Sequence, residues 1–184
     1  MSGKDLIPNH LTFFIYNHVA LFEKEHWPKA IRANGHLLLN GEKMSKSSGN
    51  FLTLRDAIDK FGADATRFAL ADSGDSIEDA NFLESVANTS TLRLFTEKEW
   101  AEEIITNQSQ LRTGKFTWFD RVCISAMQRL VHECDAAYSS MLFREALKVG
   151  FYDLQNTRNE YRKATTGNDA NEMFLSSSTI PFTF

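Results

Sequence analysis

The feature that most constrains the fold is residues 40–50, a short polar stretch between two apolar segments. Three leucines at 37–39 precede it and predict a buried strand. After it, Leu54, Ile58 and Phe61 share one face of a predicted helix. The polar stretch is therefore predicted to be a loop between a strand and a helix, where binding residues often concentrate.

Two lysines in this loop, Lys43 and Lys46, stand three residues apart, with Gly41 and Gly49 outside them. A lysine ammonium is a compact charge on a flexible stem and suits phosphate. Neighbouring hydroxyls and backbone N–H groups can complete a cradle for a polyanion. The spacing differs from both the G-x-x-x-x-G-K-[ST] phosphate loop and the G-x-G-x-x-G dinucleotide loop. A solvated basic loop carrying phosphorylatable serines is the alternative.

Residues 43–47 read Lys-Met-Ser-Lys-Ser, which resembles the KMSKS signature of class I aminoacyl-tRNA synthetases at all five positions. The surroundings resemble leucyl-tRNA synthetases of the eukaryotic and archaeal cytosolic type. The resembling stretches are 2–11, 27–28, 31–36, 49–54 and 61–67. The resemblance fades after Arg162 or Lys163, and it covers a small central part of a full synthetase.

The resemblance implies a mostly α chain with a remnant of a Rossmann-like α/β catalytic domain, namely a short strand and the KMSKS loop. An α-helical bundle would follow. Residues 1–72 would be the C-terminal part of the catalytic domain. Residues 73–163 would hold a linker helix and part of the anticodon-binding bundle, and 164–184 would be a divergent, disordered tail.

The resemblance also implies roles for individual residues. Lys46 and Lys43 would be catalytic and would stabilise the departing pyrophosphate. The implied ATP-binding residues are Met44, Ser45, Ser47, Gly3, Asp5, Asn9 and His10. Among these, Gly3 and Asp5 would contact the ribose. From the residues alone, Asp5 could instead cap a helix, and His10 could be a surface or core residue without a function.

The implied reaction converts leucine and ATP into leucyl-adenylate and pyrophosphate, and then transfers leucine to tRNA(Leu). ATP with its Mg²⁺ would be needed, and no protein-bound metal is predicted. The resemblance allows membership of a multi-synthetase complex. The chain contains no H-I-G-H-like signature. The alternative is therefore a truncated, non-catalytic product that acts at most as a weak ATP-, tRNA- or partner-binding module.

Composition agrees with a soluble globular chain, with 42% hydrophobic and 24% charged residues among 184. A net charge of −4 gives no general attraction to nucleic acid. No apolar run is long enough for a membrane span, and no signal peptide is recognisable, so a cytoplasmic location is predicted. Cys123 and Cys134 are predicted to be reduced thiols.

Helices are predicted from three- and four-residue apolar spacing, with a capping box at Thr53 and Asp56. The predicted helices cover 6–25, 54–61, 64–72, 81–105, 120–138 and 141–163. Acidic residues dominate 72–103, which indicates a solvated face. Residues 112–163 carry a net charge of plus three, which is compatible with RNA binding without requiring it.

Overall fold

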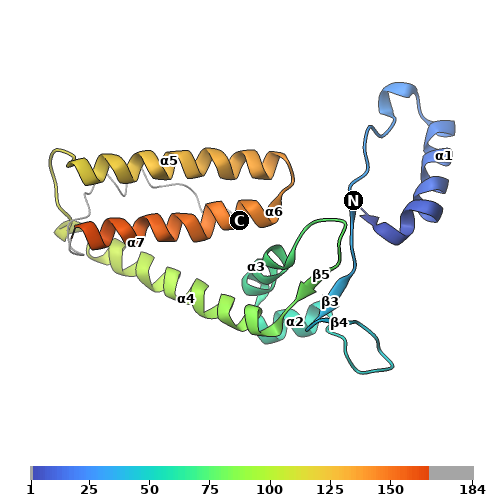
Figure 1. The fold of residues 1–184 in the computed structure, drawn as a ribbon, viewed down its shortest axis with the longest axis horizontal. Helices are drawn as coiled ribbons and strands as arrows, with labels where there is room; N and C mark the ends of the chain where they lie inside the picture. Colours follow the sequence, from blue (N-terminus) through green and yellow to red (C-terminus); the bar gives the residue numbers. More distant parts are fainter. Residues whose placement is uncertain (1, 166–184) are drawn as a thin grey trace. The chain divides into compact units, whose positions relative to one another are not determined.

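The computed structural model describes residues 2–165, so the prediction of a disordered tail falls almost wholly outside the described part. The chain divides into two compact units, Met1–Thr91 and a second that begins at Leu92. Both are built mainly from helices, and the short strands lie in the first unit (Figure 1). Among the described residues, no helix is both long and apolar enough to cross a membrane.

The first unit begins with a small parallel pair, β1 (Ser2–Gly3) beside β2 (Ala33–Asn34). Between them the chain forms η1 (Lys4–Leu6), η2 (Ile7–Leu11), α1 (Thr12–Leu21) and η3 (Lys24–His26). The predicted single helix over 6–25 is therefore wrong at both ends. The wider π-helical turn η2 carries Pro8, which lacks the N–H for regular helix bonding. At the other end Phe22 adopts an extended backbone.

The predicted strand is present as β3 (Leu37–Leu39), the centre of a three-stranded sheet in the order β4-β3-β5. β4 (Glu42–Lys43) is antiparallel to it, and β5 (Ala80–Phe82) is parallel. The helix predicted to start at 81 begins later, at α4 (Glu84–Thr106). The intervening residues instead pair with β3, and Phe82 is buried against Phe61 with ring centroids 6.2 Å apart.

Two helices follow the polar loop, α2 (Leu54–Phe61) and α3 (Ala63–Ser73). The predicted capping box is confirmed, because the side chains of Thr53 and Asp56 accept from each other's backbone N–H. Gly62, at φ 82°, separates the helices. Thr66 Oγ1 donates to the Ala57 carbonyl and joins them. Their buried faces and those of β3, β5 and α4 form the core of this unit, which contains Leu39, Ala57, Phe61, Ala65, Phe68, Ala69, Phe82 and Ala87.

After η4 (Gln108–Gln110), the second unit pairs α5 (Trp118–Ser139) with the segment formed by α6 (Phe143–Leu147), η5 (Lys148–Asp153) and α7 (Leu154–Ala164). The two arms lie side by side (Figure 1). The helix predicted over 141–163 is thus interrupted by the π-helical segment η5. At Gly150 in this segment, an added Cβ would lie 2.6 Å from Cys134 Sγ, so η5 packs closely on α5. Both cysteines are free thiols, as predicted.

Asp120 is the fully buried polar centre of the second unit. It accepts hydrogen bonds from Arg112 Nη2 at 2.5 Å and Tyr161 Oη at 2.6 Å, and from the backbone and hydroxyl of Thr117. Burial alone would raise its pKa, but these donors outweigh it and lower the pKa to about 2. Burial and the bond to Asp120 raise the pKa of Tyr161 to about 12. The Asp120 carboxylate, in the first turn of α5, thus connects this helix to α7 and to the segment that precedes α5.

Candidate functional site

The polar loop leaves the sheet as a β-hairpin. Asn40 and Gly41 link β3 to β4, and both have positive φ, at 53° and 85°. A two-residue turn with two positive φ angles matches the twist of the flanking strands, and Asn-Gly is its preferred sequence. The Asn-Gly pair is a local sequence signal for a hairpin. The predicted simple loop does not include this hairpin.

The root of the hairpin is fastened to the junction of β5 and α4. Asn40 N donates to Phe82 O at 2.9 Å, and Asn40 Oδ1 accepts from Glu84 N at 3.1 Å. Gly41 N donates to Asn81 Oδ1 at 2.8 Å. The loop is therefore anchored by segments that lie about forty residues further along the chain.

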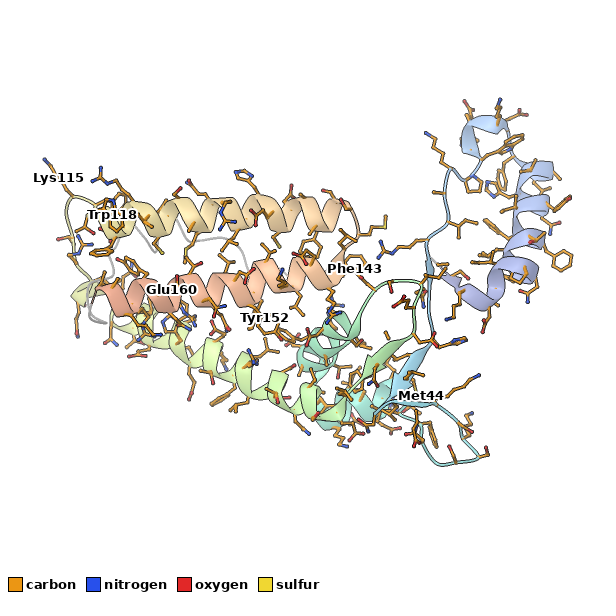
Figure 2. All side chains as sticks on the ribbon, viewed as in Figure 1. Met44, Lys115, Trp118, Phe143, Tyr152 and Glu160 are labelled. Carbon is orange, nitrogen blue, oxygen red and sulfur yellow. The ribbon has the colours of Figure 1, made fainter. Side chains whose placement is uncertain are left out.

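Beyond β4 the loop closes on itself. Ser45 N donates to Asn50 O at 2.9 Å, and the Ser45 and Ser47 hydroxyls lie 2.8 Å apart. Asn50 Nδ2 reaches the carbonyls of Leu39 and Lys43, each at 3.4 Å. Figure 2 shows Met44 at the root of this loop, where it is half-buried. The serines and Asn50 thus give the loop a defined shape.

Both lysines of the loop are exposed, Lys43 on β4 and Lys46 at the tip. Within residues 2–165 neither ammonium forms an ion pair with a carboxylate. A phosphate could therefore approach them without displacing a protein carboxylate from this part of the chain. Lys46 lies in a loop between a strand and a helix, as predicted, whereas Lys43 lies on strand β4 of the hairpin and not in the loop itself.

The second set of predicted residues lies near the start of the chain. Gly3 is in β1 with open space around it, and Asp5 is in η1 with a 68% exposed side chain. Asp5 makes no helix cap. Its Oδ2 instead lies 2.5 Å from Nε2 of His36, which precedes β3. Asn9 and His10 are exposed on η2, where the Asn9 side chain accepts from the His10 backbone N–H.

Asp79, just before β5, joins β1–η1 to the sheet. Its Oδ1 accepts from Lys4 Nζ at 2.6 Å and from the backbone N–H of His36 at 2.8 Å. The hydrogen bond from Lys4, followed by that from His36, lowers the pKa of Asp79 to about 2. The contact has no local sequence signal, because its partners lie 75 and 43 residues away.

Within residues 2–165, no polar interaction joins the two predicted sets of site residues. In the described part of the chain, no hydrogen bond or ion pair joins Lys43 or Lys46 to Gly3, Asp5, Asn9 or His10. The first unit therefore offers two separate polar places, a basic loop after β3 and an acidic residue on η1.

Comparison with known families identifies the class of this protein. The model of a family described as "tRNA synthetases class I (M)" matches residues 1–93, about half of the chain. This chain therefore belongs to the class I tRNA synthetase family. The resemblance inferred from the KMSKS stretch is confirmed at this level.

The individual relatives are leucine–tRNA ligases. The cytoplasmic enzyme of Saccharomyces cerevisiae is 58% identical over 166 residues, or 90% of this chain. Those of Pongo abelii and Arabidopsis thaliana are 53% and 56% identical over 89% and 88% of it. The matches cover 15%, 14% and 15% of those relatives, so the chain spans only a small part of their length.

A solved structure shares the fold. It is a LeuRS of Agrobacterium radiobacter K84, in a ternary complex with tRNA and LeuAMS. The TM-score is 0.70 at 18% identity, and the match covers 96% of this chain and 23% of that one. The mostly helical fold with small sheets is therefore one that a known synthetase contains.

Proposed function

We propose that this chain carries the pyrophosphate-binding loop of a leucine–tRNA ligase, with Lys46 and Lys43 as the catalytic cations. The observation that carries the proposal is the pair of exposed lysines, on a loop held in shape by its own serines and by Asn50. The identity to cytoplasmic leucine–tRNA ligases supports leucine as the amino acid and the cytoplasm as the location.

In this reaction a carboxylate oxygen of leucine attacks the α-phosphorus of ATP. The bond from that phosphorus to the oxygen bridging to the β-phosphate breaks, and pyrophosphate leaves with the electron pair. Negative charge therefore grows on the leaving group in the transition state. Two positioned ammonium groups stabilise that charge more than they stabilise the ground state, which is how they increase the rate. Mg²⁺ would accompany ATP and neutralise part of the charge on its phosphates.

The other predicted residues would bind the nucleotide. Met44, Ser45 and Ser47 shape the loop, and backbone N–H groups of the loop add donors for phosphate. Gly3 and Asp5 would meet the ribose, with Asn9 and His10 alongside. We infer that the KMSKS hairpin and its strand are the remnant of a Rossmann-like sheet, in which ligands bind beyond the carboxyl ends of the strands.

The helices of the second unit would belong to an anticodon-binding bundle that meets tRNA(Leu). The predicted division at 72/73 stays a proposal about domains, whereas the compact units divide at 91/92. Membership of a multi-synthetase complex also stays a proposal.

The alternative is a function without catalysis. Two observations favour it: the chain spans 15% of its S. cerevisiae relative, and it contains no H-I-G-H-like signature. It would be a non-catalytic module that binds ATP, tRNA or a protein partner weakly. The two functions differ in whether the purified 184-residue chain performs chemistry.

Leucine-dependent exchange of labelled pyrophosphate into ATP, measured beside calorimetric ATP binding, separates the two. Exchange that Lys46→Ala lowers by about 10²–10³-fold supports the ligase. Lys163→Ala on α7 is the matched control and should change nothing. ATP binding that depends on Lys46 without exchange supports the non-catalytic module. If the chain shows neither exchange nor binding, the nucleotide-site proposal is wrong.

A further inference from the structure

The imidazole of His36 lies between two carboxylates. Its Nε2 is 2.5 Å from Asp5 Oδ2, and its Nδ1 is 3.3 Å from Asp79 Oδ1. Carboxylates only accept hydrogen bonds, so each ring nitrogen faces an acceptor. Within residues 2–165 no three His, Cys, Asp or Glu side chains are arranged to hold a metal ion. The contact between His36 Nε2 and Asp5 Oδ2 has the geometry of a hydrogen bond.

The backbone of His36 is fixed on both sides. Its N–H donates to Asp79 Oδ1 at 2.8 Å, and its carbonyl accepts from Ala80 N at 2.9 Å. The preceding Gly35 donates to Ser76 O at 3.1 Å and packs so closely on Glu78 that a side chain has no room. Since Lys4 also holds Asp79 at 2.6 Å, the ring of His36 projects from a rigid frame.

Asp5, in contrast, stands on a three-residue helical turn with an exposed side chain. An exposed carboxylate normally samples several rotamers, and fixing it costs conformational entropy. The bond from His36 holds one oxygen, while the 68% exposed carboxyl group stays open to a ligand. A carboxylate held in this way suits two adjacent hydroxyl groups, which need acceptors at fixed positions.

We propose that His36, held by Asp79, is a positioning residue that presents the Asp5 carboxylate to the vicinal hydroxyl groups of a nucleotide ribose. This inference rests on the proposed function, in which Asp5 contacts the ribose. It adds His36 and Asp79, which act through Asp5 and do not touch the nucleotide.

The test compares the affinities of the 184-residue chain for ATP and for 2′,3′-dideoxy-ATP by calorimetry. The wild-type chain should prefer ATP, because the dideoxy analogue leaves Asp5 without its hydroxyl partners. His36→Leu should lower that preference about tenfold, and through weaker binding of ATP alone, since the hydrogen bond that fixes the Asp5 carboxylate is lost. His36→Gln keeps an N–H donor near the position of Nε2 and should restore most of the preference.

Matched variants separate this inference from the proposed function. Lys46→Ala should weaken both nucleotides equally and keep the preference. His132→Leu, on the exposed face of α5, should leave both affinities unchanged. If Asp5→Asn abolishes the preference while His36→Leu keeps it, His36 has no positioning role and the proposed function stands. If the wild-type chain binds neither nucleotide, both proposals are overturned.

Folding is checked by circular dichroism for every variant. Should His36→Leu fail to fold, His36→Gln and Asp79→Asn decide the question. The proposal requires that His36→Gln retain the preference for ATP and that Asp79→Asn lower it. If His36→Gln loses the preference for ATP and Asp79→Asn keeps it, the proposal is overturned.

Discussion

At the scale of single residues, Gly35 is a position without room for a side chain. An added Cβ would lie 2.1 Å from the carbonyl oxygen of Glu78 and 2.4 Å from its carbonyl carbon. These are backbone atoms and cannot rotate away, so the segment before β5 would have to shift. We expect Gly35→Ala to lower the free energy of unfolding by about 1–3 kcal/mol.

Urea unfolding followed by circular dichroism measures this loss. Gly3→Ala is the matched control, because Gly3 has φ −66° and open space around it. It should change stability by less than about 0.5 kcal/mol. Equal stability of the two variants would contradict the close packing seen at Gly35.

Asp120 and Tyr161 give a second prediction at this scale, a dependence of stability on pH at both extremes. The pKa of Asp120 is lowered to about 2 from an ordinary 3.8, so its stabilising contribution is present above about pH 4 and lost as the pH falls toward 2. The pKa of Tyr161 is raised to about 12 from 10, so its contribution is present below pH 10 and lost as the pH rises toward 12.

Denaturant unfolding across these two pH ranges checks the signs. Tyr161→Phe should remove the loss of unfolding free energy between pH 10 and 12 that the titration of Tyr161 causes. Asp120→Asn should reduce the loss of unfolding free energy between about pH 4 and 2. At neutral pH, Asp120→Ala should cost about 2–4 kcal/mol, because the donors around it lose a buried acceptor. Asp135→Asn, on the exposed side of α5, is the control and should leave the acid dependence as it is.

At the scale of elements, the close contact between η5 and α5 depends on a glycine, Gly150, because it has no side chain to separate the two helices. A Cβ at Gly150 would lie 2.6 Å from Cys134 Sγ and 3.6 Å from its Cβ. We expect Gly150→Ala to lower the melting temperature, since the sulfur fills the space that the methyl group needs. Cys134→Ala removes the sulfur. The double variant should therefore be more stable than the sum of the two single effects predicts, by about 1 kcal/mol or more.

A thermal melt of the wild-type chain, both single variants and the double variant measures this coupling. Cys123→Ala combined with Gly150→Ala is the matched control, because Cys123 is not among the nearest atoms to a Cβ at Gly150. Strict additivity for Gly150 and Cys134 would show that the Cys134 side chain rotates away at no cost.

The elements also show what the sequence could predict. The capping box at Thr53 was predictable because Thr and Asp make a local hydrogen-bond pattern, and the same pattern at Thr117 and Asp120 marks the start of α5. Asn81 and Phe82 of β5 are predicted as the start of a helix, but they form a strand because they pair with β3. The π-helical segments η2 and η5 share the apolar spacing of α-helices, so periodicity could not distinguish them.

The candidate site also contains a part that the sequence predicts and a part that it does not. The loop with Lys43 and Lys46 was predictable, because an apolar run and a helix pattern bracket it within a few residues. The anchors of the loop and the array of Asp5, His36 and Asp79 were not predictable. They join segments that are 31 to 44 residues apart, and side-chain contacts at that separation depend on the folded sheet.

At the scale of the whole molecule, α1 is a helix that contributes no side chain to the hydrophobic core of the first unit. It contributes no buried residue, and its large apolar side chains include Phe13, Tyr16 and Leu21, which are 68%, 75% and 77% exposed. A helix that is apolar on all sides is typical of the interior of a larger protein. The S. cerevisiae relative is several times longer than this chain, which covers 15% of it.

We therefore expect the isolated chain to associate with itself as its concentration rises, because contiguous exposed apolar surface drives association. The double variant Phe13→Lys, Leu21→Lys should sediment as a monomer at concentrations where the wild-type chain does not. Its melting temperature should be unchanged, since neither side chain is buried. Ile105→Lys, a 71% exposed position on α4, is the matched control and should leave the association intact. Sedimentation velocity over a range of concentrations measures this. A wild-type chain that stays monomeric throughout, or a double variant that melts at a lower temperature, would show that another part of the protein covers α1.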